Sequence, residues 1–289
     1  GYGALRNIIH LVQNPEIYRE KLFLHSGDLS DGSSITRIIQ EVKPDEIYNL
    51  AAQADVQESF LQPEYSIETN GTAVIRILEA IMRLKPGCKF FQAFTSELFG
   101  QTDEIPQNEN TRMNPQSPYA IGKYVGYQAV KKYREMYNSF ACNAISFNHE
   151  SERRGDDYVT RKITKAVARI KKGLQKELRL GNLDAKRDWS YSKEYVEVYW
   201  KILQQDEPDD YVIGTGETHS VKEWMEESFR IANLDYQKYL IIDQNLFRPA
   251  DVDILQADYS KAKEKLGFNP KVKFKELVKL MTEHDLENV

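Results

Sequence analysis

The stretch Lys89-Phe90-Phe91-Gln92-Ala93-Phe94-Thr95-Ser96-Glu97 is the most informative part of the chain. Its first six residues, Lys89–Phe94, are rich in aromatic side chains and predict a β-strand. Thr95 to Glu97 follow at the carboxyl end of that strand, which is where open α/β sheets bind their ligands. A hydroxyl there can hydrogen-bond a reacting oxygen, and a carboxylate there can move protons. An ordinary polar strand-to-loop transition is the alternative for this stretch taken alone.

Segments typical of strands and helices alternate around this stretch. The predicted strands are Lys21–His25, Glu46–Ala51, Lys89–Phe94 and Asn143–Asn148. The predicted helices between them, in which apolar residues recur at helical spacing, are Ser34–Val42, Glu68–Arg83 and Ser117–Tyr137. Strands that alternate with helices of this length predict βαβ units and a parallel sheet.

The regular alternation of strands and helices ends after about residue 150, where the predicted elements become shorter and less regular. They are a charged segment at Glu150–Asp157, a helix at Thr160–Lys172, a strand at Leu178–Leu180, and helices at Val221–Ala232, Ser260–Leu266 and Phe274–His284. Ser220 and Glu223 form a capping-box pattern at the start of one of these helices. This part of the chain predicts a cap that closes over a ligand.

The composition argues against several classes of function. Lys plus Arg total 39 and Asp plus Glu total 44, so the net charge of -5 offers no broad basic surface for nucleic acid or anionic membranes. The two cysteines, Cys88 and Cys142, suit a reducing compartment, and no Cys/His cluster indicates a metal. No apolar run approaches a membrane span, and no signal peptide is found. We therefore expect a cytoplasmic protein without a metal site, a nucleic-acid partner or a membrane partner.

Tyr119 and Lys123 form a candidate catalytic pair. Residues four apart on a helix share one face, and an ammonium beside a phenol favours the phenolate and lowers the pKa of the phenol. Such a phenolate can take the proton from a substrate hydroxyl while a hydride leaves the same carbon. A chance pairing on an amphipathic helix is the alternative. The position of the pair after a fourth βα unit favours catalysis.

The glycine fingerprint of dinucleotide-binding folds, GxGxxG, is not found near the start of the sequence. Gly1-Tyr2-Gly3 is only a fragment of it, and no strand-like run precedes these residues. We expect the first strand and its glycine-rich turn to be missing from this sequence.

Five motifs together resemble the extended short-chain dehydrogenase/reductases and, within them, the GDP-mannose 4,6-dehydratase family. The motifs are Thr95–Gly100, Ser117–Lys123, Phe147–Gly155, Gly181–Trp189 and Arg248–Asp253. The resemblance implies an α/β fold with a Rossmann-type doubly wound parallel sheet and a smaller C-terminal α/β substrate domain. It implies a dinucleotide-binding domain at residues 1–150 and a mainly substrate-binding domain at 151–289, with some later elements returning to the sheet.

The implied reaction oxidises GDP-mannose at C4, eliminates water across C5 and C6, and returns the hydride to C6. By resemblance Tyr119 is the base at the C4 hydroxyl and Lys123 supports it. Thr95 hydrogen-bonds the C4 oxygen, and Glu97 removes the C5 proton and protonates the departing C6 hydroxyl. The family also implies NADP as the cofactor, with NAD as the alternative, and a homodimer or homotetramer.

The resemblance also implies binding residues. The cofactor-binding positions are Asp28, Leu29, Leu50, Ala51, Ala52, Gln53, Ala54, Tyr65, Lys123, His149 and Arg154. The positions expected near the GDP-sugar are Ser96, Asn148, Lys162, Arg187 and Arg248. The guanidinium groups of Arg187 and Arg248 could clamp a diphosphate without making the protein basic overall.

Three departures from the family pattern keep other substrates open. Ala54-Asp55 stands where the family usually has Ser-His, Ser190-Tyr191 where Gly-His is usual, and Glu152 where Pro is usual. These changes fit a dehydratase of another GDP-sugar, such as a GDP-manno-heptose. Further alternatives are a sugar-nucleotide C4 reductase or epimerase and, in another class, a non-catalytic sugar-nucleotide-binding protein.

Overall fold

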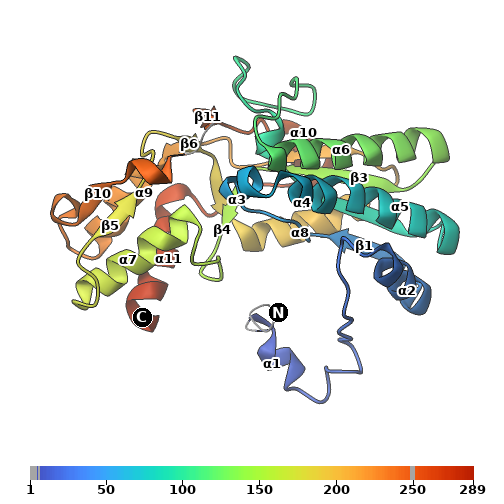
Figure 1. Cartoon of the computed structure of the whole chain (residues 1–289), viewed down its shortest axis with the longest axis horizontal. Coiled ribbons are helices and arrows are strands. Elements are labelled where there is room, and N and C mark those ends of the chain that lie inside the picture. Colours follow the sequence, from blue (N-terminus) through green and yellow to red (C-terminus); the bar gives the residue numbers. More distant parts are fainter. Residues whose placement is uncertain (1–4, 6, 248–250) are drawn as a thin grey trace.

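A parallel four-stranded sheet lies at the centre of the molecule. The structure is a computed structural model that describes residue 5, residues 7–247 and residues 251–289. The strands of the sheet, in spatial order, are β1 (Glu46–Asn49), β2 (Lys89–Thr95), β3 (Ala141–Ser146) and β8 (Asp210–Ile213). Because all four run parallel, their carboxyl ends meet at one edge of the sheet (Figure 1).

Alternate side chains of β2 enter two different hydrophobic cores, because successive residues of a strand point to opposite faces. Phe94 belongs to the core that includes α5 (Ala73–Leu84). Phe91 lies on the other face, where its ring centroid is 4.6 Å from that of Tyr199 on α8 (Ser192–Leu203). Both faces of the sheet are therefore covered by helices, as a parallel sheet requires.

Two of the helices on the α5 face begin at capping residues whose side chains accept a hydrogen bond. The Asp31 side chain accepts a hydrogen bond at the start of α2 (Gly32–Val42), and Ser117 does the same for α6 (Pro118–Tyr137). These caps satisfy backbone N–H groups that have no partner inside the helix. The other elements on this side are α3 (Val56–Leu61), α4 (Pro63–Ile67), a π-helical turn η2 (Glu68–Thr72) and a 3₁₀ turn η3 (Ser96–Leu98).

A second group of elements packs around two tryptophans, Trp189 and Trp224, whose ring centroids lie 5.2 Å apart. Its helices are α7 (Val159–Lys171), α9 (Val221–Ile231) and α11 (Phe274–Asn288). Its short strands form three small sheets: β5 (Leu178–Leu180) with β10 (Leu240–Ile242), β4 (Asn148–Glu150) with β7 (Trp189–Tyr191), and β6 (Lys186–Arg187) between β9 (His219–Ser220) and β11 (Ile254–Leu255). The remaining elements are α1 (Ile9–Val12), α10 (Ser260–Leu266), η4 (Tyr236–Lys238) and η5 (Gln244–Leu246).

The second group is not continuous in sequence. β8 belongs to the central sheet, and α8 and α10 pack on the face of that sheet opposite α5. The expected α/β fold with a parallel, Rossmann-type sheet is confirmed. The division of the chain into a cofactor domain and a substrate domain at residue 150 stays a prediction.

The prediction of a strand at Lys21–His25 is wrong. This segment forms only an isolated bridge, between Tyr18 and Leu22, and Phe23 is 61% exposed. A strand needs a neighbour that takes up its backbone hydrogen bonds. In a doubly wound sheet, two other strands lie between the third strand, the expected place of Lys21–His25, and the fourth strand, which is β1 here. The described residues before β1 form neither of these two strands. Figure 1 shows this segment leading from α1 to α2 away from the sheet.

The other predicted strands and helices are confirmed, with small shifts at their ends. The capping box is present, because Ser220 N donates to Glu223 Oε2 over 2.6 Å and Glu223 N donates to Ser220 Oγ over 3.1 Å. In the part of the chain that the structure describes, no helix is long and apolar enough to cross a membrane.

Candidate active site

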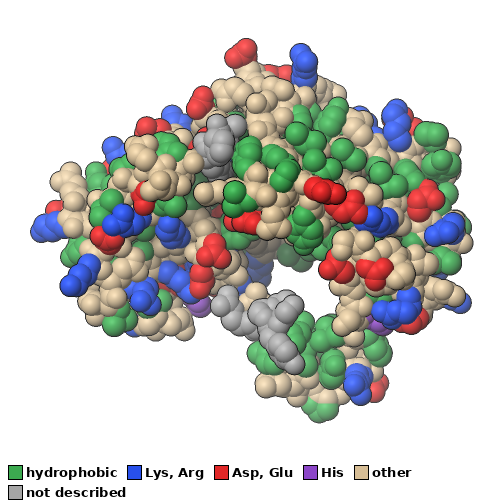
Figure 2. Space-filling view, viewed as in Figure 1, with side chains coloured by type: hydrophobic (Ala, Val, Ile, Leu, Met, Phe, Trp, Pro, Cys, Tyr) green, Lys and Arg blue, Asp and Glu red, His purple; other side chains and the backbone are tan. Residues whose placement is uncertain are grey.

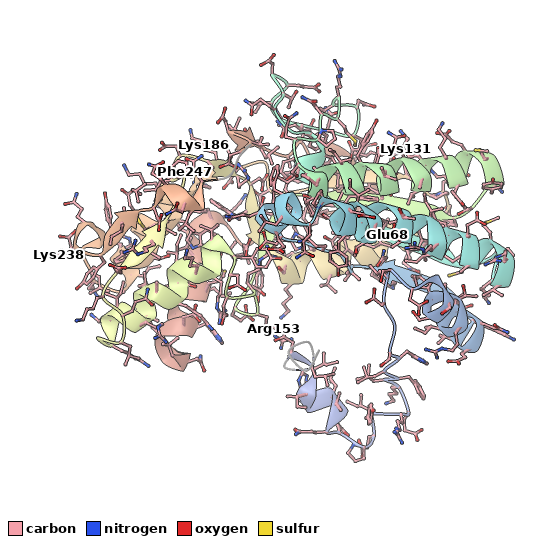
Figure 3. All side chains as sticks on the ribbon, viewed as in Figure 1. Glu68, Lys131, Arg153, Lys186, Lys238 and Phe247 are labelled. Carbon is pink, nitrogen blue, oxygen red and sulfur yellow. The ribbon has the colours of Figure 1, made fainter. Side chains whose placement is uncertain are left out.

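A cavity of about 730 Å³ lies where the carboxyl edge of the sheet meets the second group of elements. Figure 2 shows an opening between the body of the molecule and the segment that carries α1. Arg153, which lines the cavity, lies on the side of the body that faces α1 (Figure 3). The predicted residues that line the cavity are Leu50, Ala52, Ala54, Thr95, Ser96, Glu97, Tyr119, Lys123, Asn148, His149, Arg154, Lys162 and Arg187.

Five predicted cofactor positions lie outside this lining: Asp28, Leu29, Ala51, Gln53 and Tyr65. The Asp28 carboxylate is exposed and accepts hydrogen bonds from Ser30. Gln53 accepts from Ser66 and donates from its backbone to Asn70, so it braces the start of the helical region that follows. Their roles at the cofactor stay predictions. Arg248, predicted at the substrate, lies outside the described residues.

Thr95 and Glu97 are held together by the end of β2. The Thr95 hydroxyl accepts a 3.2 Å hydrogen bond from the backbone N of Glu97 and thereby starts η3. The tight turn returns the Glu97 side chain to the cavity wall, where it is 17% exposed. A hydroxyl and a carboxylate two residues apart thus line the same space.

Tyr119 and Lys123 lie on the first two turns of α6. Ser117 Oγ accepts from Ala120 N over 3.1 Å, and Pro118 occupies the first helical position, which fixes where the helix begins. The Lys123 ammonium lies 6.0 Å from the centroid of the Tyr119 ring and donates to the Ala93 carbonyl over 3.2 Å. Both side chains are buried and both line the cavity.

The electrostatics of this pair differ from the expectation. Burial raises the pKa of Tyr119, the nearby Glu97 carboxylate raises it further, and a hydrogen bond with Thr95 and the charge of Arg154 oppose the rise. The expectation of a lowered pKa is therefore wrong, and the Lys123 ammonium donates to a backbone carbonyl. Burial also lowers the pKa of Lys123 to about 8.

Arg187 is almost fully buried in the wall of the cavity, and its guanidinium is already engaged. Nη1 donates to the carbonyls of Val252 over 2.6 Å and Lys186 over 3.0 Å. Nη2 donates to Asp251 Oδ1 over 3.1 Å and lies 3.7 Å from Glu97 Oε1. The expected contact with a diphosphate stays a prediction, since little of this guanidinium is left for it.

Arg154 is oriented by a carboxylate that the sequence analysis did not single out. Its Nε lies 3.2 Å from Glu150 Oε2, and its guanidinium carbon lies 3.6 Å from the centroid of the Tyr158 ring. Thr160 donates to the same Glu150 oxygen over 2.8 Å. Glu150 and Arg154 are four positions apart within the motif Phe147–Gly155, and this spacing could have revealed the pair.

His149 is a neutral member of the site. Burial and the charge of Arg154 together lower the pKa of its imidazole to about 4, and the hydrogen bond with the Phe147 carbonyl opposes this shift. The ring is stacked on Tyr195, with centroids 4.4 Å apart, and Nδ1 lies 2.9 Å from the Phe147 carbonyl. The imidazole can therefore act near neutral pH as a hydrogen-bonding group but not as a cation.

The positions that depart from the family pattern have local structural partners. Asp55 lines the cavity, but its carboxylate caps α3 by accepting from the backbone of Gln57 and Glu58. Ser190 donates to Tyr195 over 2.7 Å, and Tyr195 in turn donates to the Ile213 carbonyl. Asp55 thus brings a carboxylate to the cavity, although this carboxylate already accepts hydrogen bonds at the start of α3.

A parallel sheet whose carboxyl edge faces a buried Tyr and Lys on one helix defines the class of short-chain dehydrogenase/reductases. In agreement with that fold, the structure matches the structure of RMD from Pseudomonas aeruginosa complexed with NADPH at a TM-score of 0.85, with 22% identity over 100% of this chain and 97% of that chain. The family of GDP-mannose 4,6 dehydratase matches residues 3–281, and the chain belongs to this family.

Two curated relatives come from Arabidopsis thaliana. GDP-mannose 4,6 dehydratase 2 is 49% identical over 287 residues, covering 98% of this chain and 77% of that protein. GDP-mannose 4,6 dehydratase 1 is 48% identical over 283 residues, covering 96% of this chain and 78% of that protein.

Proposed function

We propose that this protein is a GDP-mannose 4,6-dehydratase, an NADP-dependent lyase that forms a 4-keto-6-deoxy sugar nucleotide. The observation that carries the proposal is the meeting of Thr95, Glu97, Tyr119 and Lys123 at one cavity in a chain of this family. A C4 reductase or epimerase has no need of Glu97, and a binding module has no use for all four side chains.

The oxidation begins with the removal of a proton from the C4 hydroxyl. Tyr119 takes that proton, and Thr95 hydrogen-bonds the same oxygen. The Thr95 hydroxyl and the Arg154 charge both favour the phenolate, against the effect of burial on the pKa of Tyr119. A bound NADP would supply the hydride chemistry, as acceptor of the hydride from C4 and as its donor to C6, and the proton held by Tyr119 would balance that addition at C5.

The elimination depends on Glu97. A ketone at C4 acidifies the hydrogen at C5, so a carboxylate within the cavity can remove it as a proton. The C6–O bond then breaks, and Glu97 gives the same proton to the departing hydroxyl, which leaves as water. One carboxylate thus serves both proton transfers.

The cavity suits a dinucleotide. The small side chains of Ala52 and Ala54 line it after β1, where the backbone can approach a ribose or pyrophosphate closely. The Lys123 ammonium has three donors, of which the Ala93 carbonyl uses one, so it can also hold the nicotinamide ribose. His149 and Arg154 would complete the cofactor site, and NAD is the alternative to NADP.

The substrate side of the site is proposed from the same cavity. Ser96, Asn148, Lys162 and Arg187 line it and are the residues proposed to contact the GDP-sugar. We further propose that the enzyme is cytoplasmic and acts as a homodimer or homotetramer, as the family resemblance implies.

Incubation of the purified protein with GDP-mannose and NADP tests the proposal. The expected product is a 4-keto-6-deoxy sugar nucleotide that is lighter than the substrate by one water, as measured by mass spectrometry. A parallel reaction with a GDP-manno-heptose tests the alternative substrate. No turnover of any GDP-sugar would contradict the proposed function.

A further inference from the structure

Arg187 is a buried cation shared by two carboxylates that are far apart in sequence. Its side chain is 7% exposed, while those of Glu97 and Asp251 are 17% and 21% exposed. A guanidinium in such a place needs a counter-charge, because an unpaired buried charge is strongly destabilising. Glu97 and Asp251 both supply that charge at Nη2.

The guanidinium has little freedom to move toward Glu97. Nη1 is fixed by two backbone carbonyls, those of Lys186 and Val252, and Nη2 donates to Asp251. Asp251 is itself held, since its Oδ2 accepts from Asn182 Nδ2 over 3.0 Å. Two chain segments, residues 182–186 and 251–252, therefore fix the orientation of one arginine.

The distances to the two carboxylates are unequal. Nη2 lies 3.1 Å from Asp251 Oδ1 but 3.7 Å from Glu97 Oε1. Hydrogen bonds from N–H to O are about 2.7–3.2 Å long, so the contact with Asp251 is a hydrogen bond and the contact with Glu97 is not. Glu97 is therefore close enough to be attracted by the charge of Arg187, yet the two side chains form no direct hydrogen bond.

We propose that Asp251 is a positioning residue for Glu97, which it controls by restraining Arg187. While the Asp251 carboxylate holds Nη2, Arg187 leaves the Glu97 carboxylate free to take the proton from C5. Without the Asp251 carboxylate, Nη2 is released and closes the ion pair with Glu97 while Nη1 stays on its two carbonyls, and Glu97 is withdrawn from the substrate. The inference rests on the proposed function, because it assigns to Glu97 the elimination step.

Isotope effects on the Asp251→Asn enzyme test the proposal with GDP-mannose deuterated at C5 or at C4. We expect kcat to fall roughly tenfold to a hundredfold, as for a misplaced reacting group, with KM unchanged. The isotope effect on kcat from C5 should rise and that from C4 should fall. Asp251→Glu should recover much of the rate, because it restores the carboxylate.

Asp253→Asn is the matched control, since Asp253 is an exposed carboxylate two residues away that contacts Gln101 and does not line the cavity. A general structural defect would lower kcat and leave both isotope effects as in the unmodified enzyme. That result, or an unchanged kcat in Asp251→Asn, would overturn the proposal.

A double-mutant cycle tests the shared cation without any turnover. Glu97→Gln and Asp251→Asn each leave Arg187 with one carboxylate, whereas the double variant leaves the buried cation with neither. The double variant should lose more free energy of unfolding than the two single losses combined. Additive losses would refute the coupling, and inactivity of the unmodified protein would instead count against the proposed function.

Discussion

The hydroxyl of Thr95 accepts a hydrogen bond from the backbone N of Glu97, so the residue expected to contact the C4 oxygen also starts the turn that carries the acid/base. The two steps of the proposed reaction are therefore linked through one side chain. Loss of this hydroxyl removes a cap and, in the proposed reaction, the contact to the C4 oxygen at the same time.

Thr95→Val should impair both steps, whereas Thr95→Ser should keep most of the activity. Valine has a similar shape but no hydroxyl, and loss of a capping hydroxyl costs about 1 kcal/mol of stability. We expect kcat to fall roughly a hundredfold in the valine variant and less than tenfold in the serine variant. Equal kcat values for the two variants, measured with GDP-mannose, would argue against a role for the hydroxyl.

Glu97→Gln should abolish dehydration and leave oxidation at C4. Glutamine keeps the size of the side chain but cannot accept the C5 proton. A single-turnover experiment should show formation of reduced nicotinamide without release of the 6-deoxy product. Asp103→Asn, which changes an exposed carboxylate nearby, is the control. If the glutamine variant still eliminates water, another group performs the proton transfer.

Lys123 should make the stability of the protein rise with pH in the alkaline range. Burial lowers its pKa from 10.5 to about 8, so between these values the unfolded chain binds a proton that the folded protein does not. Stability rises with pH where the unfolded state binds more protons. This group then contributes a rise of roughly 3 kcal/mol across that range.

Unfolding by denaturant at several pH values between 7 and 10 measures this effect. Lys123→Met should remove the rise and should be more stable than the unmodified protein at pH 7, although inactive. Lys176→Met, a change at an exposed lysine, should leave the rise in place. A Lys123→Met profile that parallels that of the unmodified protein would exclude this origin.

Glu150→Gln should weaken the binding of NADP by about tenfold, equivalent to about 1.4 kcal/mol. The carboxylate orients Arg154, and the neutral amide of glutamine lacks the negative charge that attracts the guanidinium. Equilibrium titration of the purified protein with NADP measures the change. Glu197→Gln, on the exposed side of α8, should bind as the unmodified protein does. Unchanged affinity in Glu150→Gln would remove Arg154 from the cofactor site.

Much of the site could be predicted because its signals are local. The aromatic run before Thr95, the cap at Ser117 and the spacing of Tyr119 and Lys123 each lie within a few residues of one another. The rule that parallel strands end at one edge then predicts that these segments meet. The cavity lining confirms this meeting.

The remaining features depend on contacts that no local pattern contains. Whether Lys21–His25 forms a strand depends on a partner strand, not on its own residues. The pairing of Arg187 with Asp251 spans 64 positions. The direction of the pKa shift of Tyr119 follows from burial and from the nearby Glu97 carboxylate, both of which depend on the tertiary structure.

Thr95, Tyr119 and Lys123 all come from one continuous stretch, residues 95–123, whereas Arg187 beside Glu97, and Asp251 that holds Arg187, come from later parts of the chain. Contacts between nearby residues form early in folding, and contacts that close long loops form late. The oxidising half of the proposed reaction thus draws these side chains from one continuous unit of sequence. Recombination that moved this unit into a related sheet would transfer oxidation at C4, but control of elimination would have to be acquired from the new surroundings.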